Sequence, residues 1–436
     1  MTTWNEAFIQ TLVSDSGTLR DAEKLARSNV WSGTGCNTQA VWGFAQGSGK
    51  SPYQVCIDLN DAATKCSCPS RKFPCKHAVG LMLLLARGTV PKGNESPAWV
   101  TTWLEGRERK REATPPPAPK MPDMAAQAKR EAARAAKVSA GIEELRLFLE
   151  DLMRRGLSDP EVKSYAFWDR VAARMVDAQM QPIARRLRGL GGVPIQKKVD
   201  WVSLLLDEIG RLYTLTEAHQ RIESLPESLA HDVRAALGFS LKHDEVLAQG
   251  TSVTDQWQIL GVLTESVEQL MERRTWLYGE ATQRYALLLD FAHRSRPFDT
   301  HYPTGQSFNG ELVYYPSAYP QRAVLKERKS SYNPITSTQI RLADTVEDIL
   351  DAYADALAIN PFLQCIPAGL PDGWVTRSDL IDSKGMKLPL GKGAQAQWLS
   401  AVMGGNRLPV FGEWDGMAFQ IAALVTADGW IQMGDA

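Results

Sequence analysis

Three cysteines and one histidine lie within twelve residues, from Cys66 to His77, in a chain that holds six cysteines and six histidines in all. Their spacing is Cys-x-Cys, six residues, then Cys-x-His. Thiolates and imidazole are ligands that Zn²⁺ prefers, and structural zinc sites use four protein ligands in a tetrahedron. The sequence therefore predicts one structural zinc ion, bound by Cys66, Cys68, Cys75 and His77.

Other interpretations of this cluster are weaker. An iron–sulfur site needs mostly thiolates, and only three are within reach. Four unconnected residues would rarely show this spacing by chance. Cys56 could be a further ligand, but we expect it to be a packed or free thiol.

The flanking segments must position the four ligands. The runs at 40–46 and 53–59 favour two strands of a hairpin, and Tyr53, Val55, Ile57 and Leu59 alternate onto one face as in a half-buried strand. The apolar run at 77–88 predicts a short helix that ends at Gly88. A ββα unit of this size buries little by itself. Zinc would supply about 10–16 kcal/mol of binding free energy, so replacing any ligand should unfold the module.

This arrangement resembles the SWIM zinc finger. The resemblance rests on the strand pair, on "CSCP", "CKH" and the apolar helix, and on "SPAWVTTWLEGR" at 96–107. It covers roughly residues 30–107. It implies a zinc-stabilised, non-catalytic ββα module that binds nucleic acid or protein partners. Some bacterial members resemble components of systems with a MoxR-type AAA+ ATPase and a von Willebrand A-domain protein, which suggests such a complex as an alternative.

The finger carries a local positive charge. Residues 62–94 hold six cations and no acidic residue, and Zn²⁺ with three thiolates brings the local charge to about +5. Arg107 to Lys137 adds nine basic and four acidic residues. The cations could bind phosphates or offset the thiolates, and Trp42, Tyr53 and Phe73 could stack on bases or pack in a core. The candidate nucleic-acid contacts are Lys65, Arg71, Lys72, Lys76 and Arg87.

A second motif, "GSGKS" at 47–51, does not predict a phosphate-binding loop. Phe44 occupies the position where the motif needs its first glycine, and Pro52 with a strand follows where a helix is required. We expect the glycines to serve the hairpin turn.

The rest of the chain falls into three parts. Five prolines at 111–123 indicate an extended linker. Ile142, Leu145, Leu149 and Leu152 then begin a helical pattern. From 257 strand patterns dominate, with a helix within 333–361 and Asp-Gly turns that favour a three-strand meander at the end. No internal repeat is evident in the sequence.

The C-terminal half shows no catalytic constellation. His219, His231 and His243 lack metal-ligand spacing, His301 with Asp299 is a weak pair, and isolated Cys36 and Cys365 favour burial. We expect no enzyme activity and no small-molecule substrate. A set of tyrosines could form a contact surface for a protein partner or could simply pack the domain. They are Tyr314, Tyr315, Tyr319 and Tyr332.

Composition sets the broad class. The chain has 436 residues, a net charge of −1 and 44% hydrophobic residues, as ordinary globular proteins do. It has no apolar run of membrane-spanning length and no secretory signal, so we expect a cytoplasmic protein with no membrane contact. We predict an α+β multidomain protein with a zinc-stabilised ββα finger module at 1–107, a linker at 108–140, a helical region at 141–250 and a β-rich α+β domain at 251–436. Its expected function is that of a zinc-binding adaptor for nucleic acid, most simply DNA.

Overall fold

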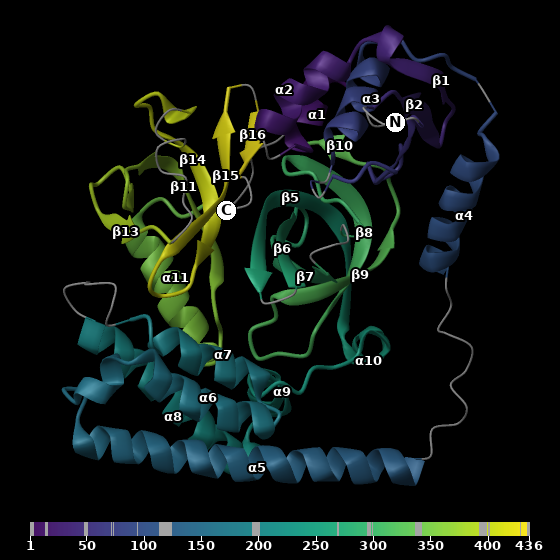
Figure 1. Cartoon of the computed structure of the whole chain (residues 1–436). Coiled ribbons are helices and arrows are strands. Elements are labelled where there is room, and N and C mark those ends of the chain that lie inside the picture. The colour runs from purple at the N-terminus through teal and green to yellow at the C-terminus, as the bar shows by residue number, and fades with distance from the viewer. Residues whose placement is uncertain are drawn as a thin grey trace.

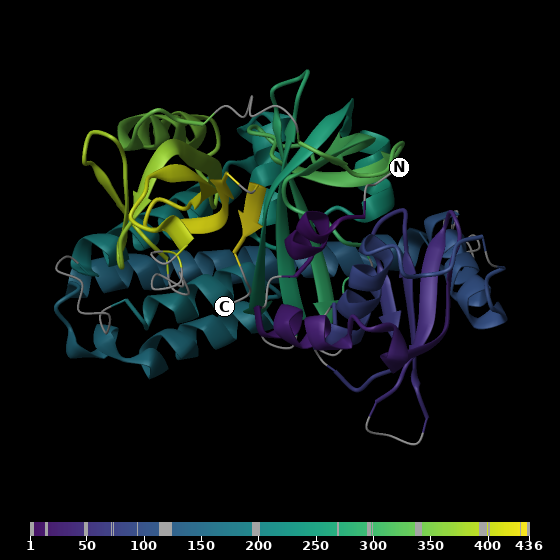
Figure 2. The same cartoon turned by 90° about the horizontal axis from the view of Figure 1, so that it is seen from above.

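The computed structural model describes residues 4–433 except 14–15, 48–50, 71, 73, 94, 113–123, 194–200, 268–269, 294–297, 299, 336–341, 392–398, 400–401 and 428. Four parts follow one another along the chain: a finger module, a helical bundle and two β-barrels (Figure 1). The finger and the two barrels lie in a row, with the first barrel in the middle (Figure 2). The mixed α+β class and the β-rich C-terminal part are as predicted.

The finger module is larger than a ββα unit. The predicted hairpin is present, with Ala40 opposite Asp58 and Ala45 opposite Tyr53. The sheet order is β1-β2-β3-β4, and two helices that the sequence patterns did not reveal precede it. A single hydrophobic core joins the two helices and the four strands to helix α3. They are α1 (Glu6–Thr11), α2 (Ser16–Leu25), β1 (Trp31–Cys36), β2 (Ala40–Ala45), β3 (Tyr53–Asp58), β4 (Thr64–Cys66) and α3 (Lys76–Ala86).

Helix α4 (Ala98–Glu112) covers the second face of this sheet. Trp42 and Cys56 on that face are buried against Val100. The expectation of a half-buried β3 was therefore wrong, because Cys56 and Asp58 are buried as well as Val55 and Ile57. Cys56 is a packed thiol, as expected.

The helical region forms a bundle with its own core. The periodic residues Ile142, Leu145, Leu149 and Leu152 are all buried in it. The long α5 runs along the base of the molecule (Figure 1). The bundle helices are α5 (Met124–Arg155), α6 (Tyr165–Asp177), α7 (Gln181–Leu190), α8 (Trp201–Gln220) and α9 (Glu227–Ala236), and α10 (His243–Gln249) leads into the first barrel.

The first barrel is closed. Its strands pair in the order β8-β5-β6-β7-β9, and β9 also pairs with β8. All of these pairs are antiparallel except β7 with β9. The strands are β5 (Thr251–Val267), β6 (Leu270–Gly279), β7 (Tyr285–His293), β8 (Gln306–Tyr314) and β9 (Arg322–Arg328), with the short β10 (Asn333–Pro334) added to β8.

The second barrel repeats this order. Its strands run β13-β12-β11-β14-β15, and a parallel bridge from Leu390 to Phe419 joins the end of β13 to β15. The predicted meander is present as β14, β15 and β16, and the predicted helix is the shorter α11. The elements are α11 (Val346–Ile359), β11 (Ile366–Val375), β12 (Asp379–Ile381), β13 (Lys387–Pro389), β14 (Leu408–Trp414), β15 (Phe419–Thr426) and β16 (Gly429–Gln432).

The C-terminal tyrosines mainly pack the domain. Tyr314 and Tyr332 are 0% and 2% exposed and belong to the core of the first barrel. Tyr315 and Tyr319 are half-buried. The packing alternative is thus confirmed for Tyr314 and Tyr332. Among the described helices, none combines the length and apolar character needed to cross a membrane.

Candidate metal centre and adjoining cleft

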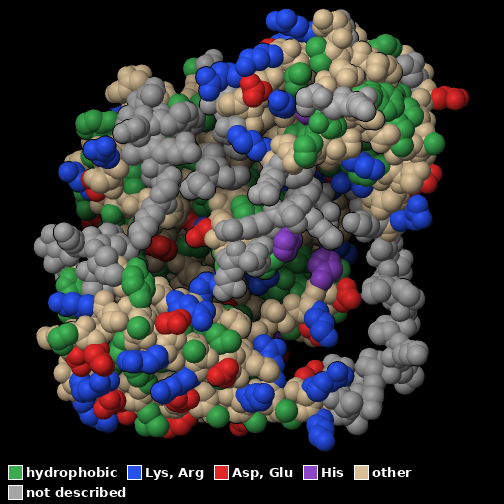
Figure 3. Space-filling view, viewed as in Figure 1, with side chains coloured by type: hydrophobic (Ala, Val, Ile, Leu, Met, Phe, Trp, Pro, Cys, Tyr) green, Lys and Arg blue, Asp and Glu red, His purple; other side chains and the backbone are tan. Residues whose placement is uncertain are grey.

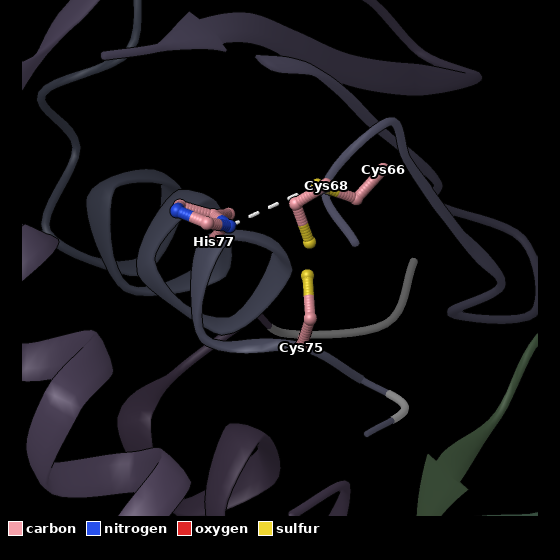
Figure 4. A group of neighbouring side chains, drawn as sticks. All are labelled: Cys66, Cys68, Cys75 and His77. Atoms are coloured by element: carbon pink, nitrogen blue, oxygen red, sulfur yellow. Dashed lines mark hydrogen bonds between the residues drawn. The ribbon is translucent and has the colours of Figure 1, made fainter. Parts of the chain in front are cut away.

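Four ligands come from three consecutive local structures. Cys66 ends β4, where it lies opposite Val55 of β3. Cys68 lies in the loop that follows, Cys75 is the residue that precedes α3, and His77 is in the first turn of that helix. In Figure 4 the sulfur atoms of Cys68 and Cys75 point toward one another, and the His77 ring faces Cys66.

The geometry fits Zn²⁺. The four ligand atoms all lie within 4.8 Å of one another, and Cys66 Sγ lies 4.0 Å from His77 Nδ1. Tetrahedral Zn²⁺ with bonds of about 2.3 Å to sulfur and 2.0 Å to nitrogen needs ligand atoms roughly 3.5–3.8 Å apart. Small side-chain shifts are enough to bring the four ligand atoms from their observed spacing to the spacing that tetrahedral zinc needs. These residues accordingly hold one structural zinc ion, with three thiolates and an imidazole that use all four positions.

The cluster favours a thiolate at Cys75. A hydrogen bond from the Cys66 thiol, with others from His77 and the Ala78 N–H, lowers the pKa of Cys75 to about 4. The same hydrogen bond, together with burial and the Cys75 charge, raises the pKa of Cys66. A cation that binds here would overcome the repulsion that keeps the other thiols protonated.

Helix α3 anchors the site because it is buried on every side. His77 and the next seven residues are all buried. Helix α2 approaches so closely at Gly80 that a Cβ there would lie 3.2 Å from Leu25 Cβ. Tyr53 of β3 packs on the His77 ring with centroids 5.0 Å apart. Gly88 ends the helix with φ +67°, as its position in the sequence predicts.

A cleft opens beside the metal centre. Its volume is about 1060 Å³, and its walls come from α2, the end of β2, Tyr53 of β3 and the loop that carries Cys68. Arg20, Lys24, Lys72 and Lys76 line it, against the carboxylates of Asp21 and Glu23. The lining thus has a net charge of +2.

The carboxylates of this lining are engaged within the module. Lys24 binds Asp21 at 3.0 Å, and Arg87 binds Glu23 at 2.8 Å and Glu6 at 2.7 Å. In Figure 3, Lys and Arg side chains gather over the region of α2 at the top of the molecule. Lys24 is thus paired with Asp21, and Arg20, Lys72 and Lys76 give the lining its excess of positive charge.

The predicted nucleic-acid contacts separate into three groups. Lys72 and Lys76 line the cleft. Lys65 is exposed on β4. Arg87, in contrast, is held against α1 and α2 by its ion pairs with Glu6 and Glu23. Arg71 lies outside the described residues, as do Phe73, Asp299 and residues 48–50 of the "GSGKS" turn.

Sequence reasoning missed the contribution of α2. Arg20 and Lys24 lie far from the cysteines in sequence and reach the cleft only because α2 packs on α3. The signal available in the sequence was the amphipathic pattern at 16–25, because the apolar face of an amphipathic helix must pack against another element.

Family comparisons place two known domains on the chain. A SWIM zinc finger model matches residues 53–86, and a model of the SWIM-associated four-helix bundle domain matches residues 133–237. Comparisons with curated proteins and with solved structures each gave no significant match. The matched finger contains all four ligands, and the matched bundle spans most of α5 and all of α6 to α9. The chain thus contains a SWIM zinc finger at residues 53–86, followed by a SWIM-associated four-helix bundle domain at residues 133–237.

Proposed function

We propose that this protein is a non-catalytic adaptor whose SWIM finger module binds nucleic acid. The observation that carries the proposal is the cationic cleft beside the zinc site. Lys72 and Lys76 flank two of its ligands, and Arg20 adds a further positive charge from α2. Phosphate contacts by Lys and Arg supply most of the affinity of such surfaces.

The zinc ion has a structural part in this proposal. It fixes the loop that carries Lys72 against the first turn of α3 that carries Lys76, so that both ammonium groups face the same cleft. Tyr53 in the cleft wall offers an aromatic surface near these cations. We place the protein in the cytoplasm, in agreement with six cysteines of which none forms a disulfide.

The test is fluorescence anisotropy of the zinc-loaded full chain with labelled duplex DNA, single-stranded DNA and RNA at several salt concentrations. We expect the affinity to fall steeply with salt. The Arg20→Ala, Lys72→Ala and Lys76→Ala triple variant should reduce the slope of log affinity against log salt by roughly 2–3.

Lys137→Ala with Arg170→Ala and Arg185→Ala is the matched control, because it also removes three cations and all three residues are exposed on the bundle, outside the lining of the cleft. Equal loss in both variants, or no binding at low salt, would refute the nucleic-acid proposal. The finger would then be better explained as a protein-binding module of an ATPase-containing complex, and co-purification from cells would be the next measurement.

A further inference from the structure

Both barrels have the same strand connections. Counted along each barrel, strand 1 pairs with 2 and 4, strand 2 with 3, strand 4 with 5, and strands 3 and 5 are parallel. Strand 1 carries a bulge next to a glycine in each, at Gly261 and Gly373. This is the connectivity of the OB-fold, a five-stranded Greek-key barrel whose strand 2–3 face binds oligonucleotides and oligosaccharides. Fold alone does not assign a function, so the residues on the two faces must decide.

The face of the first barrel is covered. Trp276 and Tyr278 of β6 and Leu287 of β7 pack against Phe411 and Ala422 of the second barrel. Trp276 Nε1 also donates to Glu413 of β14 at 3.0 Å. This surface is an internal interface and has no room for a ligand.

The corresponding face of the second barrel is open. Trp374, Ile381 and Lys387 form one cross-strand row on β11, β12 and β13. Trp374 is 44% exposed and Lys387 is also exposed, while Ile381 between them is 8% exposed and forms the floor of the row. The neighbouring row of Val375, Leu380 and Leu388 points inward and is fully buried. Core packing therefore does not account for Trp374. Figure 1 and Figure 2 both place these strands at the outer end of the molecule, away from the first barrel.

Three cations lie on the segments around the exposed Trp374 row. Arg377 follows β11, Lys384 lies in the turn between β12 and β13, and Lys387 shares the row of Trp374; all three are exposed. Three carboxylates lie nearby. Asp379 of β12 is half-buried on the same face and accepts a hydrogen bond from Ser378 Oγ at 2.6 Å. Asp382 is buried and accepts the backbone N–H groups of Val346, Lys384 and Met386. Asp372 lies 4.0 Å from Arg407. The three carboxylates are thus engaged in these hydrogen bonds or paired with Arg407, and this arrangement favours a polyanion at Arg377 and Lys387 over a neutral sugar chain.

We propose that the second barrel binds single-stranded nucleic acid across β11, β12 and β13. A base stacks on Trp374, and the backbone phosphates lie against Arg377 and Lys387. Stacking on an exposed aromatic needs an unpaired base, because the bases of a duplex already stack on each other. The site shares no residue with the finger cleft, so it holds whether or not the finger binds nucleic acid.

The test uses the zinc-loaded full chain in which Arg20, Lys72 and Lys76 are already replaced by Ala. Its affinity for a labelled oligothymidylate then reports the barrel. Trp374→Ala in this background should weaken binding about 5- to 100-fold, while Trp374→Phe keeps most of the affinity. Arg377→Gln with Lys387→Gln should lower the salt dependence. A duplex of equal length should bind much more weakly than the single strand.

Phe291→Ala is the control, because Phe291 is a similarly exposed aromatic on a strand of the first barrel, 51% accessible. Thermal melts verify that each variant is folded. Unchanged oligothymidylate affinity in Trp374→Ala would overturn the proposal. The proposal would also be overturned if the background variant no longer bound single strands while the wild type did. In that case the finger proposal would stand. Binding that is independent of salt and competed by a neutral oligosaccharide would also overturn it.

Discussion

Cys75 has two roles at the scale of single residues, because it is a zinc ligand and also the residue before α3. We expect Cys75→Ser to reduce bound zinc from one equivalent to nearly none. A ββα unit alone should unfold without zinc, but the observed module is larger, and α1, α2, the sheet and α3 share a core that extends well beyond the ligands. Loss of zinc should therefore expose β4 and the loop up to Cys75 to amide exchange well before α3. Metal analysis and hydrogen exchange of the full chain measure both effects.

Cys56→Ala is the control for this prediction. Cys56 is buried against α4 and lies outside the ligand cluster, so this variant should keep its zinc even if it loses some stability. Stoichiometric zinc in Cys75→Ser would contradict the ligand assignment.

His301 provides a residue-scale prediction about pH. It is half-buried, and its Nε2 is buried without a hydrogen-bond partner among the described residues. Burial and then the charge of Arg273 lower its pKa to about 4, and the charge of Asp61 in the finger module opposes this in part. The unfolded chain binds the proton nearer pH 6.5. Stability from neutral His301 is therefore complete above about pH 6.5 and is lost as the pH falls toward 4.

Urea unfolding at about pH 7 and pH 5 measures this effect. The wild type should lose about 2 kcal/mol more than His301→Gln over this interval. His293→Gln, at an exposed position in the same barrel, should behave as the wild type does. An equal pH response in wild type and His301→Gln would exclude the buried neutral histidine.

At the scale of elements, Arg107 fastens α4 to the finger sheet. It lies 2.6 Å from Asp61 and 3.4 Å from Asp58, whose side chains are only 4% and 3% exposed. Arg107→Ala leaves two buried carboxylates without this cation, which should cost about 3–5 kcal/mol of unfolding free energy. Arg109→Ala, two residues further along α4 at a side chain that is 74% exposed, should cost less than about 0.5 kcal/mol. Chemical denaturation compares the two, and equal costs would refute the role of Arg107.

Elements were predictable where the local pattern decided them. The hairpin, α3, the start of the bundle core and the final meander follow from alternation, helical spacing and Asp-Gly turns. Helices α1 and α2 were missed because their apolar residues have a partner only once α3 is in place. Burial of the outer face of β3 was missed for the same reason, because the helix that packs on this face, α4, lies outside the hairpin in sequence.

The candidate site was likewise predictable only where residues close in sequence define it. All four zinc ligands are close in sequence, so their spacing identified them. The cleft depends on α2, and the shared barrel topology depends on pairings such as β5 with β8 and β11 with β14, which join strands far apart in the chain. No sequence repeat accompanies that structural repeat, because barrel closure constrains strand order and leaves the side chains free to differ.

At the scale of the whole molecule, polar contacts join the successive parts. Arg274 of the first barrel binds Glu413 of the second at 2.8 Å. Arg211 of the bundle donates to Tyr353 on α11 at 3.0 Å, and Asp232 accepts the Ala318 N–H at 2.8 Å. The barrels thus form a fixed pair on the bundle, which leaves the finger cleft at one end of the row and the Trp374 face at the other. A nucleic acid held at both sites would have to run past the first barrel.

The close approach of the two barrels can be tested at Gly261. A Cβ there would lie 2.6 Å from Ala422 Cβ and 3.2 Å from Phe411 Cδ1, so a larger side chain must push β5 and β15 apart. We expect Gly261→Val to destabilise the chain by about 1–3 kcal/mol and to make the segment between the barrels sensitive to protease. Gly210→Ala on α8, where a Cβ meets nothing within 4 Å, should instead stabilise the helix slightly. Denaturation and limited proteolysis report both effects. A Gly261→Val protein as stable and as protease-resistant as the wild type would show that the barrels do not pack through this contact, and the covered face of the first barrel would then be open to ligands.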